Sequence, residues 1–318
     1  MSFAVVTDTS GNLLNRHVKA YDLKVLPFSY YINGEEHTCL DTDAFDGESF
    51  YSGLKKDVKV TTSQINPQAY ADCFETYLKK GLDVLYVSMS SGISGSCHSS
   101  MIAAEMLLES YPDRRIEIID TLGASLGEGL VAIRAAQLRD EGADIEEAAK
   151  QLRMLSERMF NVFTVNDLMF LRRGGRLSNL SALVGTVLHI KPILKGSTDG
   201  QIVAFGKVRG RKRSVEILAE MYQKYAVNPE QQVVGIAHAK CLEDALMLKD
   251  LLCKHRPPKE VLIVDYEPVT GSHVGPGALA LFFESYPGIR AIDSILPEET
   301  VSCSSGPVSA CRVRPASN

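Results

Sequence analysis

The sequence has no tryptophan, and none of its apolar runs reaches the roughly 18 residues that a membrane-spanning helix needs. The formal net charge is −5, so there is no overall basic field to attract nucleic acid. The first ten residues, MSFAVVTDTS, lack the basic head and apolar core of a secretory signal peptide. We therefore expect a cytoplasmic protein with no stable membrane insertion and no nucleic-acid partner.

Paired cysteines are also missing. The chain has seven cysteines, none in a C-x-x-C arrangement, and an odd number fits reduced thiols better than a disulfide framework. The seven histidines are scattered, with no His/Cys cluster at metal-ligand spacing. No G-x-x-x-x-G-K-[ST] loop occurs. The sequence predicts no metal site, no cofactor and no nucleotide site of the P-loop type.

The first half of the chain alternates between strand and helix patterns. Strands are predicted at 3–8, 84–89 and 116–120, with helical patterns after the second and third. This alternation predicts parallel strands with crossover helices. Loops at Asp8–Ser10 and Ser90–Ser96 and at Asp120–Ser125 would then open at the carboxyl edge of the sheet, where ligands collect in such folds.

A polar helix at 144–159 marks the transition to a second half with its own strands and helices. We predict an N-terminal parallel-sheet α/β domain at 1–158 and a C-terminal α/β or α+β domain at 159–296. Residues 297–318 are rich in small polar residues and predict a disordered tail. The elements predicted in the second half are strands at 161–165, 201–208, 233–239, 261–266 and 289–293, and helices near 213–226, 242–254 and 276–285.

The stretch VSMSSGISGSCHSSM, residues 87–101, holds seven serines and two glycines directly after a predicted strand. The segment GISGS resembles the nucleophile elbow G-x-S-x-G, but Ser96 stands where the last glycine belongs. Gly92 and Gly95 permit a tight backbone, and the start of the next helix offers free N–H groups and Ser94 a hydroxyl for an anion. A plain turn with a serine N-cap explains the composition equally well.

Four further motifs have both a functional and an ordinary explanation. TTSQ holds Thr62 and Ser63, which are a second hydroxyl cluster or a capped loop. RRGGR, ending at Arg176, is an anion-binding turn or a solvated one. KVRGRKRS, with Arg209, suits an acidic partner or a phosphate, or is a solvated helix start. GSHVGPG places His273 in a glycine loop, where it donates to an anion or is structural.

Taken in order, VTDTS, TTSQ, SSGISGS, LRRGGRLS with IKPIL, KVRGRKRS and GSHVGPGALALFF resemble the DegV family of bacterial fatty-acid-binding proteins over about residues 3–290. The resemblance implies two α/β domains with a long-chain fatty acid (C14–C18) between them. It implies a non-catalytic acyl carrier that presents the fatty acid to a separate ATP-dependent kinase. The acyl phosphate made there feeds phospholipid synthesis.

The resemblance also assigns residues. The carboxylate is expected at Thr62 and Ser94, with their motif neighbours Ser63 and Gly95, and near His273. Arg176 would support the head group, and Arg209 would dock the kinase. Apolar patterns at LVGTVLHI and ALALFF offer walls for the tail, or are ordinary core. The residues Ser96 and Cys97 depart mildly from the family pattern.

Two other functions remain open from the sequence. A serine hydrolase could act on an acyl ester through Ser94, provided that a base is oriented towards it. A regulatory protein could bind DNA through RGRKR, although no aromatic residues interleave with these cations.

Overall fold

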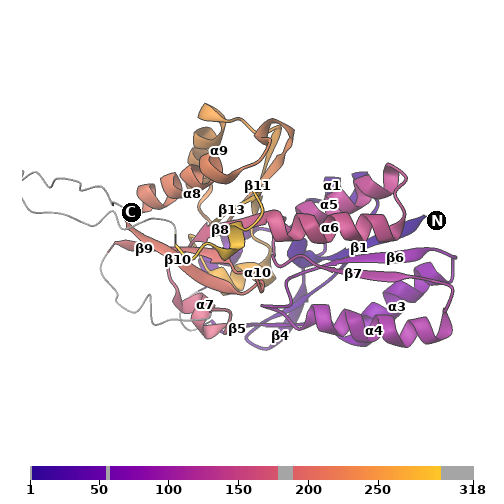
Figure 1. The fold of residues 1–318 in the computed structure, drawn as a ribbon. Coiled ribbons are helices and arrows are strands. Elements are labelled where there is room, and N and C mark those ends of the chain that lie inside the picture. The colour runs from indigo at the N-terminus through magenta and orange to yellow at the C-terminus, as the bar shows by residue number, and fades with distance from the viewer. Residues whose placement is uncertain (1, 55–57, 178–188, 295–318) are drawn as a thin grey trace, which may run out of the picture.

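The computed structural model describes residues 2–54, 58–177 and 189–294, which form two lobes in contact (Figure 1). The chain passes from the sheet of the first lobe to that of the second between the strand that ends at Asp120 and the strand that begins at Met159. The predicted fold class, a parallel-sheet N-terminal part followed by a mixed α/β part, is confirmed. The limits 1–158 and 159–296 stay a prediction. The predicted tail 297–318 lies outside the described residues, as does most of the LVGTVLHI pattern.

The N-terminal lobe is built on a four-stranded parallel sheet of order β2-β1-β6-β7. Every residue of β1 and β6 is buried, as expected where helices cover both faces. Val5 packs with one set of helices and Val6 with the other, because successive side chains of a strand point to opposite faces. The strands are β1 (Phe3–Asp8), β2 (Leu23–Leu26), β6 (Asp83–Ser88) and β7 (Ile116–Asp120).

Helices α3 and α4 cover one face of this sheet, and α5 and α6 cover the other (Figure 1). Helix α3 begins directly at Pro67, whose missing N–H costs nothing there, and Asn66 caps it by accepting from the amide of Ala69. The helices of this lobe are α1 (Asn15–Ala20), α2 (Gly47–Gly53), α3 (Pro67–Leu78), α4 (Ser96–Ser110), α5 (Leu126–Asp140) and α6 (Ile145–Arg158), and a 3-10 turn, η1, spans Thr9–Gly11.

A small antiparallel sheet of order β4-β3-β5 projects from this lobe and was not predicted. Its strands are four residues each, too short for a clear alternation pattern. Thr62 and Ser63, expected in a loop, instead end a strand and pair with Tyr30 and Ser29. The strands are β3 (Ser29–Ile32), β4 (Glu35–Thr38) and β5 (Val60–Ser63).

The C-terminal lobe contains a six-stranded sheet of order β10-β9-β8-β13-β11-β12, in which only β11 and β12 run parallel. Helices α8 and α9 cover one face (Figure 1). The strands are β8 (Met159–Thr164), β9 (Ile190–Gly196), β10 (Ile202–Arg209), β11 (Val233–His238), β12 (Glu260–Asp265) and β13 (Leu279–Glu284). The helices are α7 (Met169–Arg173), α8 (Arg211–Tyr225), α9 (Leu242–His255) and α10 (Pro268–Val274), with 3-10 turns η3 (Pro229–Gln231) and η4 (Ile289–Ala291).

Two predicted elements of this lobe are wrong. The helix expected near 276–285 is strand β13, which pairs with β8 and β11 in the middle of the sheet. A short apolar run buried on both faces has no periodicity that separates strand from helix. The helix of this region lies earlier, at α10. The strand expected at 289–293 is largely the 3-10 turn η4, which pairs with no other strand.

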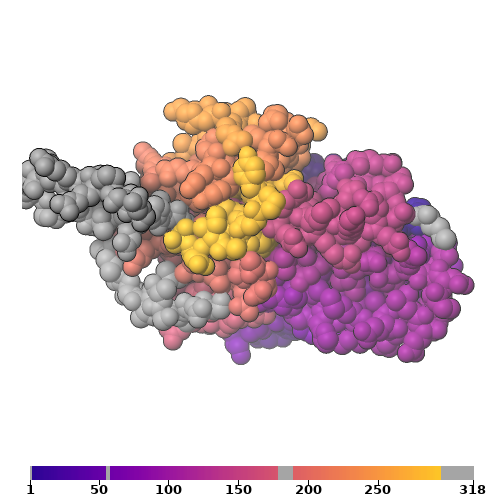
Figure 2. Space-filling view, viewed as in Figure 1, coloured from indigo at the N-terminus to yellow at the C-terminus, as the bar shows by residue number. Residues whose placement is uncertain are grey.

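Helix α5 packs against strands of both sheets and joins the two lobes into one core. Hydrogen bonds reinforce this junction. The side-chain amide of Asn12 donates to the backbone carbonyl of Asp265 at 2.8 Å, and the hydroxyl of Tyr51 donates to the backbone carbonyl of Tyr266 at 2.5 Å. The lobes fit closely in the space-filling view (Figure 2). Within the described ranges, none of the helices has the length and hydropathy needed to cross a bilayer.

Candidate ligand cavity between the lobes

A cavity of about 280 Å³ lies between the two lobes. Its walls come from β5 and the loops after β6 and β7 on one side, and from β8, α7, α10 and β13 on the other. The volume is close to the lower end of the range for small-molecule sites. Most of the lining is apolar and includes Phe28, Ile93, Phe163, Leu171, Val269 and Phe282.

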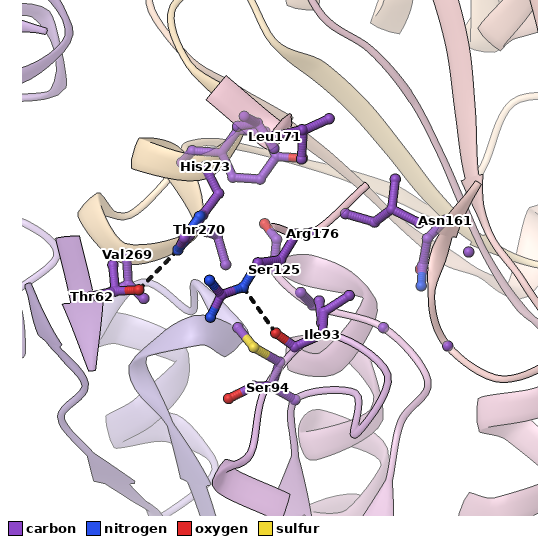
Figure 3. A pocket seen from close by; sticks show the side chains of 18 of the residues that line it. Thr62, Ile93, Ser94, Ser125, Asn161, Leu171, Arg176, Val269, Thr270 and His273 are labelled. Atoms are coloured by element: carbon purple, nitrogen blue, oxygen red, sulfur yellow. Dashed lines mark hydrogen bonds between the residues drawn. The ribbon is translucent and has the colours of Figure 1, made fainter. Parts of the chain in front are cut away.

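All six residues predicted to bind a ligand line this cavity, although they are spread over more than two hundred positions of sequence (Figure 3). They are Thr62, Ser63, Ser94, Gly95, Arg176 and His273. The structure thus brings together the TTSQ, SSGISGS, RRGGR and GSHVGPG motifs. Arg209 lies elsewhere, exposed at the end of β10.

Thr62 and His273 form a direct link between the lobes. The threonine hydroxyl and His273 Nε2 share a hydrogen bond of 2.8 Å (Figure 3). Burial, and to a smaller extent the positive charge of Arg176, together lower the pKa of His273 to about 4. The imidazole is therefore neutral at pH 7 and can donate through one nitrogen only.

Ser94 sits in a loop that is held tightly against the other lobe. Its Oγ accepts from the amide of Ser96 at 3.2 Å, so its own proton is free for another acceptor. A Cβ added to Gly92 would come within 2.4 Å of the Asp199 carbonyl oxygen, so only glycine allows this approach. The first residue of α4 follows Gly95, which has no side chain to cap it. The loop therefore satisfies the first amide of α4 through Ser94 and also brings the two lobes into close contact at Gly92.

Arg176 lies between Thr62 and Ser94 in the close view (Figure 3). Its Nε donates to the carbonyl of Ile93 at 3.2 Å, and its Nη1 donates to the carbonyl of Gly174. Among the described residues that line the cavity, it is the only one with a full charge. It therefore supplies the positive potential that an anionic head group needs.

A second cavity of about 390 Å³ adjoins the first and shares Thr62, Arg176 and His273 with it. Its wall also includes Lys59 and Arg173. The shared residues form a polar partition between an apolar chamber and a basic one. We call the Thr62–His273 side of the first cavity its outer end.

Sequence reasoning missed several polar residues in the same cavity, among them Ser125 and Asn161. Ser125 and Asn161 both line it, and they are 1% and 7% exposed. Ser125 ends a loop that was expected at the ligand edge of the sheet, but only its position in that loop pointed to it. Asn161 was hidden in a predicted strand, where a polar residue among apolar neighbours was the one available signal.

The third predicted edge loop, Asp8–Ser10, does not line this cavity. Asp8 and Glu128 are fully buried, and the hydroxyl of Ser10 bridges them with contacts of 2.5 and 2.6 Å. Burial raises the pKa of both carboxyl groups, and the charge of Asp8 raises that of Glu128 further. One serine proton cannot be donated to two carboxylates at once, so this arrangement favours a protonated acid in the pair.

The contacts around Ser94 bear on the hydrolase hypothesis. His273 is hydrogen-bonded to Thr62, and no histidine or carboxylate in the described part of the chain hydrogen-bonds to the Ser94 hydroxyl. No group of three or more histidine, cysteine, aspartate or glutamate side chains among the described residues could hold a metal ion.

Two of the three arginines in the basic stretch of the DNA-binding hypothesis pair with acidic neighbours. Arg211 pairs with Asp244 at 2.9 Å, and Arg213 with Glu220 at 2.5 Å. Pairing of these two arginines lowers the positive potential that the stretch offers to a phosphate backbone.

Comparisons with known proteins agree with this geometry. A family model described as "Uncharacterised protein, DegV family" matches residues 2–286. A DegV domain-containing protein of Clostridium perfringens is 38% identical over 281 residues, which cover 88% of this chain and 97% of the relative. A DegV domain-containing protein of Lactococcus lactis is 31% identical and covers 89% and 97%.

Solved structures with the same fold include the following two, both at more than 25% identity to this chain. A DegV family protein from Thermus thermophilus, described as binding fatty acid, superposes with a TM-score of 0.81 at 27% identity, covering 90% of this chain and all of that one. DegV from Bacillus subtilis, described as a fatty acid binding protein, gives 0.75 at 29% identity and covers 90% and 100%. From its sequence and its fold, this chain belongs to the DegV family.

Proposed function

We propose that the protein binds a long-chain fatty acid (C14–C18) in the interlobe cavity, with the carboxylate at Thr62 and Ser94 and the tail along the apolar walls. The observation that carries this proposal is the convergence of two hydroxyls, a neutral imidazole and one arginine at one end of an apolar cavity. The fatty acid binding described for the Thermus and Bacillus relatives supports it.

The apolar chamber accounts for affinity and the outer end for orientation. Each buried CH₂ contributes about 0.8 kcal/mol, so roughly 14 methylenes give on the order of 11 kcal/mol before the entropy costs of binding. A buried carboxylate without partners is very costly. Donors on Thr62 and Ser94, with the charge of Arg176, remove that cost. Ser63, Gly95 and His273 complete the surroundings of the head group.

The protein on this proposal is a carrier, and a separate ATP-dependent kinase phosphorylates the bound carboxylate for phospholipid synthesis in the cytoplasm. The second, basic cavity supports this, because it meets the carboxylate site at Thr62, Arg176 and His273. Phosphoryl transfer needs an approach to the carboxylate from outside, and cations stabilise the transferred charge. The exposed Arg209 would contact the kinase.

Lipid extraction and mass spectrometry of freshly purified protein test this function. We expect about one equivalent of a C14–C18 acid per chain, and uptake of palmitate by delipidated protein. Absence of both retention and uptake would contradict the proposal. Labelling of Ser94 by a fluorophosphonate probe, lost in Ser94→Ala, would instead establish the hydrolase alternative.

A further inference from the structure

The inner end of the cavity, opposite the Thr62–His273 pair, contains polar groups that the proposed head-group site does not use. In Figure 3, Asn161 lies across the cavity from Thr62, with Ser125 between them. Both side chains are more than nine-tenths buried. Neither Asn161 Oδ1 nor Ser125 Oγ has a hydrogen-bond partner within the described part of the chain.

The chain makes room for the Asn161 carboxamide with two glycines. A Cβ at Gly123 would come within 2.4 Å of Asn161 Nδ2, and a Cβ at Gly127 would come within 2.3 Å of Oδ1. Gly127 lies inside α5, where glycine is less stable than alanine. The carboxamide therefore lies along the backbone from Gly123 to Gly127, next to Ser125, and the assignment of its two atoms does not matter because both ends are unpartnered.

Ser125 is held in an unusual conformation. Its φ of 54° and ψ of −143° fall in a region that is nearly restricted to glycine. It occupies the N-cap position of α5, yet its side chain makes no capping hydrogen bond. Ser125 therefore neither relaxes its backbone nor caps its helix, and its hydroxyl stays buried and unpaired in the wall of the cavity, beside the partially positive end of a 15-residue helix.

We propose that Asn161 and Ser125 recognise a hydroxyl group on the chain of the bound acid, so that the preferred ligand is a hydroxylated long-chain fatty acid. This inference rests on the proposed fatty-acid-binding function. A hydroxyl both donates and accepts, which matches an amide and a serine hydroxyl together. A plain hydrocarbon chain leaves both groups desolvated and unpaired. Sites built to pair a ligand oxygen discriminate strongly against ligands that lack it.

The test is a competition for the delipidated protein between stearic acid and a set of monohydroxystearic acids that differ only in the position of the hydroxyl. Mass spectrometry of the retained acids measures the outcome. We expect a narrow range of hydroxyl positions to be enriched roughly tenfold over stearic acid, since pairing one buried polar group changes affinity by about that factor. A sharp optimum in position is the signature of a fixed recognition point.

Two variants assign that optimum to the inner end. Asn161→Leu and Ser125→Gly should each reduce the enrichment severalfold, whereas the matched change Asn166→Leu should preserve it. Asn166 is exposed, accepts from Lys191 at 2.8 Å and does not line the cavity. The inference would be overturned if stearic acid were retained equally with each hydroxystearic acid, or if the preferred hydroxyl position persisted in both variants. Fatty acid binding itself would remain intact in either case. Retention of no acid at all would overturn both proposals.

Discussion

At the outer end of the cavity, Thr62 and His273 hydrogen-bond each other across the lobe junction, whereas at the inner end the side-chain oxygens of Asn161 and Ser125 have no hydrogen-bond partner among the described residues. The outer groups form a preorganised set that a carboxylate joins without leaving any of them unpaired. The inner groups have been desolvated by the fold without compensation. On the proposed function, the outer end would fix the orientation of any fatty acid, and the inner end would select among fatty acids.

The largest expected effect on palmitate affinity comes from removing both hydroxyls of the outer end. Thr62→Val combined with Ser94→Ala should weaken palmitate binding by roughly 2–5 kcal/mol, because the carboxylate loses two hydrogen-bond donors in a buried site. Titration of delipidated protein with palmitate measures this. Ser100→Ala is the matched control, since Ser100 is buried on α4, donates to the carbonyl of Cys97 and does not line the cavity. Equal affinities in the double variant and the control would place the carboxylate elsewhere.

A pH titration separates the two ends, because His273 at the outer end titrates, whereas the side chains of Asn161 and Ser125 at the inner end do not. The pKa of His273 is lowered from 6.5 to about 4, so the unfolded chain binds this proton more readily than the folded one. The contribution of His273 to stability is therefore complete above about pH 6.5, falls as the pH falls and is lost below about pH 4. Its size is at most about 3 kcal/mol.

Chemical denaturation of the lipid-free protein between pH 4 and pH 7 checks this. Comparison with His273→Gln isolates the histidine from buried carboxyl groups such as Glu267, whose raised pKa, about 7, acts with the opposite sign. The stability difference between wild type and variant should shrink towards acid. A difference independent of pH would mean that His273 is not a buried neutral imidazole.

A smaller effect is expected on stability at the inner end. Ser125→Gly relieves the backbone at φ 54° and removes an unpaired buried hydroxyl. Against this, glycine costs conformational entropy, so we expect a net stabilisation of about 1 kcal/mol. Thermal denaturation should show a melting temperature about 2 °C higher. The matched change Ser100→Gly should not stabilise the protein. A lower melting temperature for Ser125→Gly would contradict the inference that the backbone of Ser125 is strained.

The smallest effect on lipid binding is expected at Arg209, which is exposed and belongs to neither end. Arg209→Ala should leave palmitate affinity unchanged within twofold. If a separate kinase acts on the bound acid, as proposed, the variant should slow that phosphorylation severalfold, since charges at the rim of an interface act mainly on association. Loss of lipid retention in this variant would show that Arg209 acts on the cavity after all.

How much the sequence predicted also differs between the two ends. The outer residues lie in motifs that resemble those of the DegV family, so Thr62, Ser94 and His273 could be selected before the fold was known. Asn161 could not, because its meaning depends on its contact with a loop more than thirty residues earlier in the chain.

The fold shows the same division. The parallel sheet of the first lobe follows from alternating strand and helix patterns. The apolar sequence of β13, in contrast, is equally typical of a buried helix. Only its pairing with β8 and β11, which depends on distant residues, decides the matter.

The central claim is that the fatty acid lies with its carboxylate at the outer end and its tail towards Asn161. A crystal structure of the palmitate-loaded protein tests this most directly. We predict carboxylate oxygens within hydrogen-bonding distance of Thr62 Oγ1 and Ser94 Oγ. A carboxylate bound instead to Ser125 and Asn161, with the tail towards His273, would contradict the account.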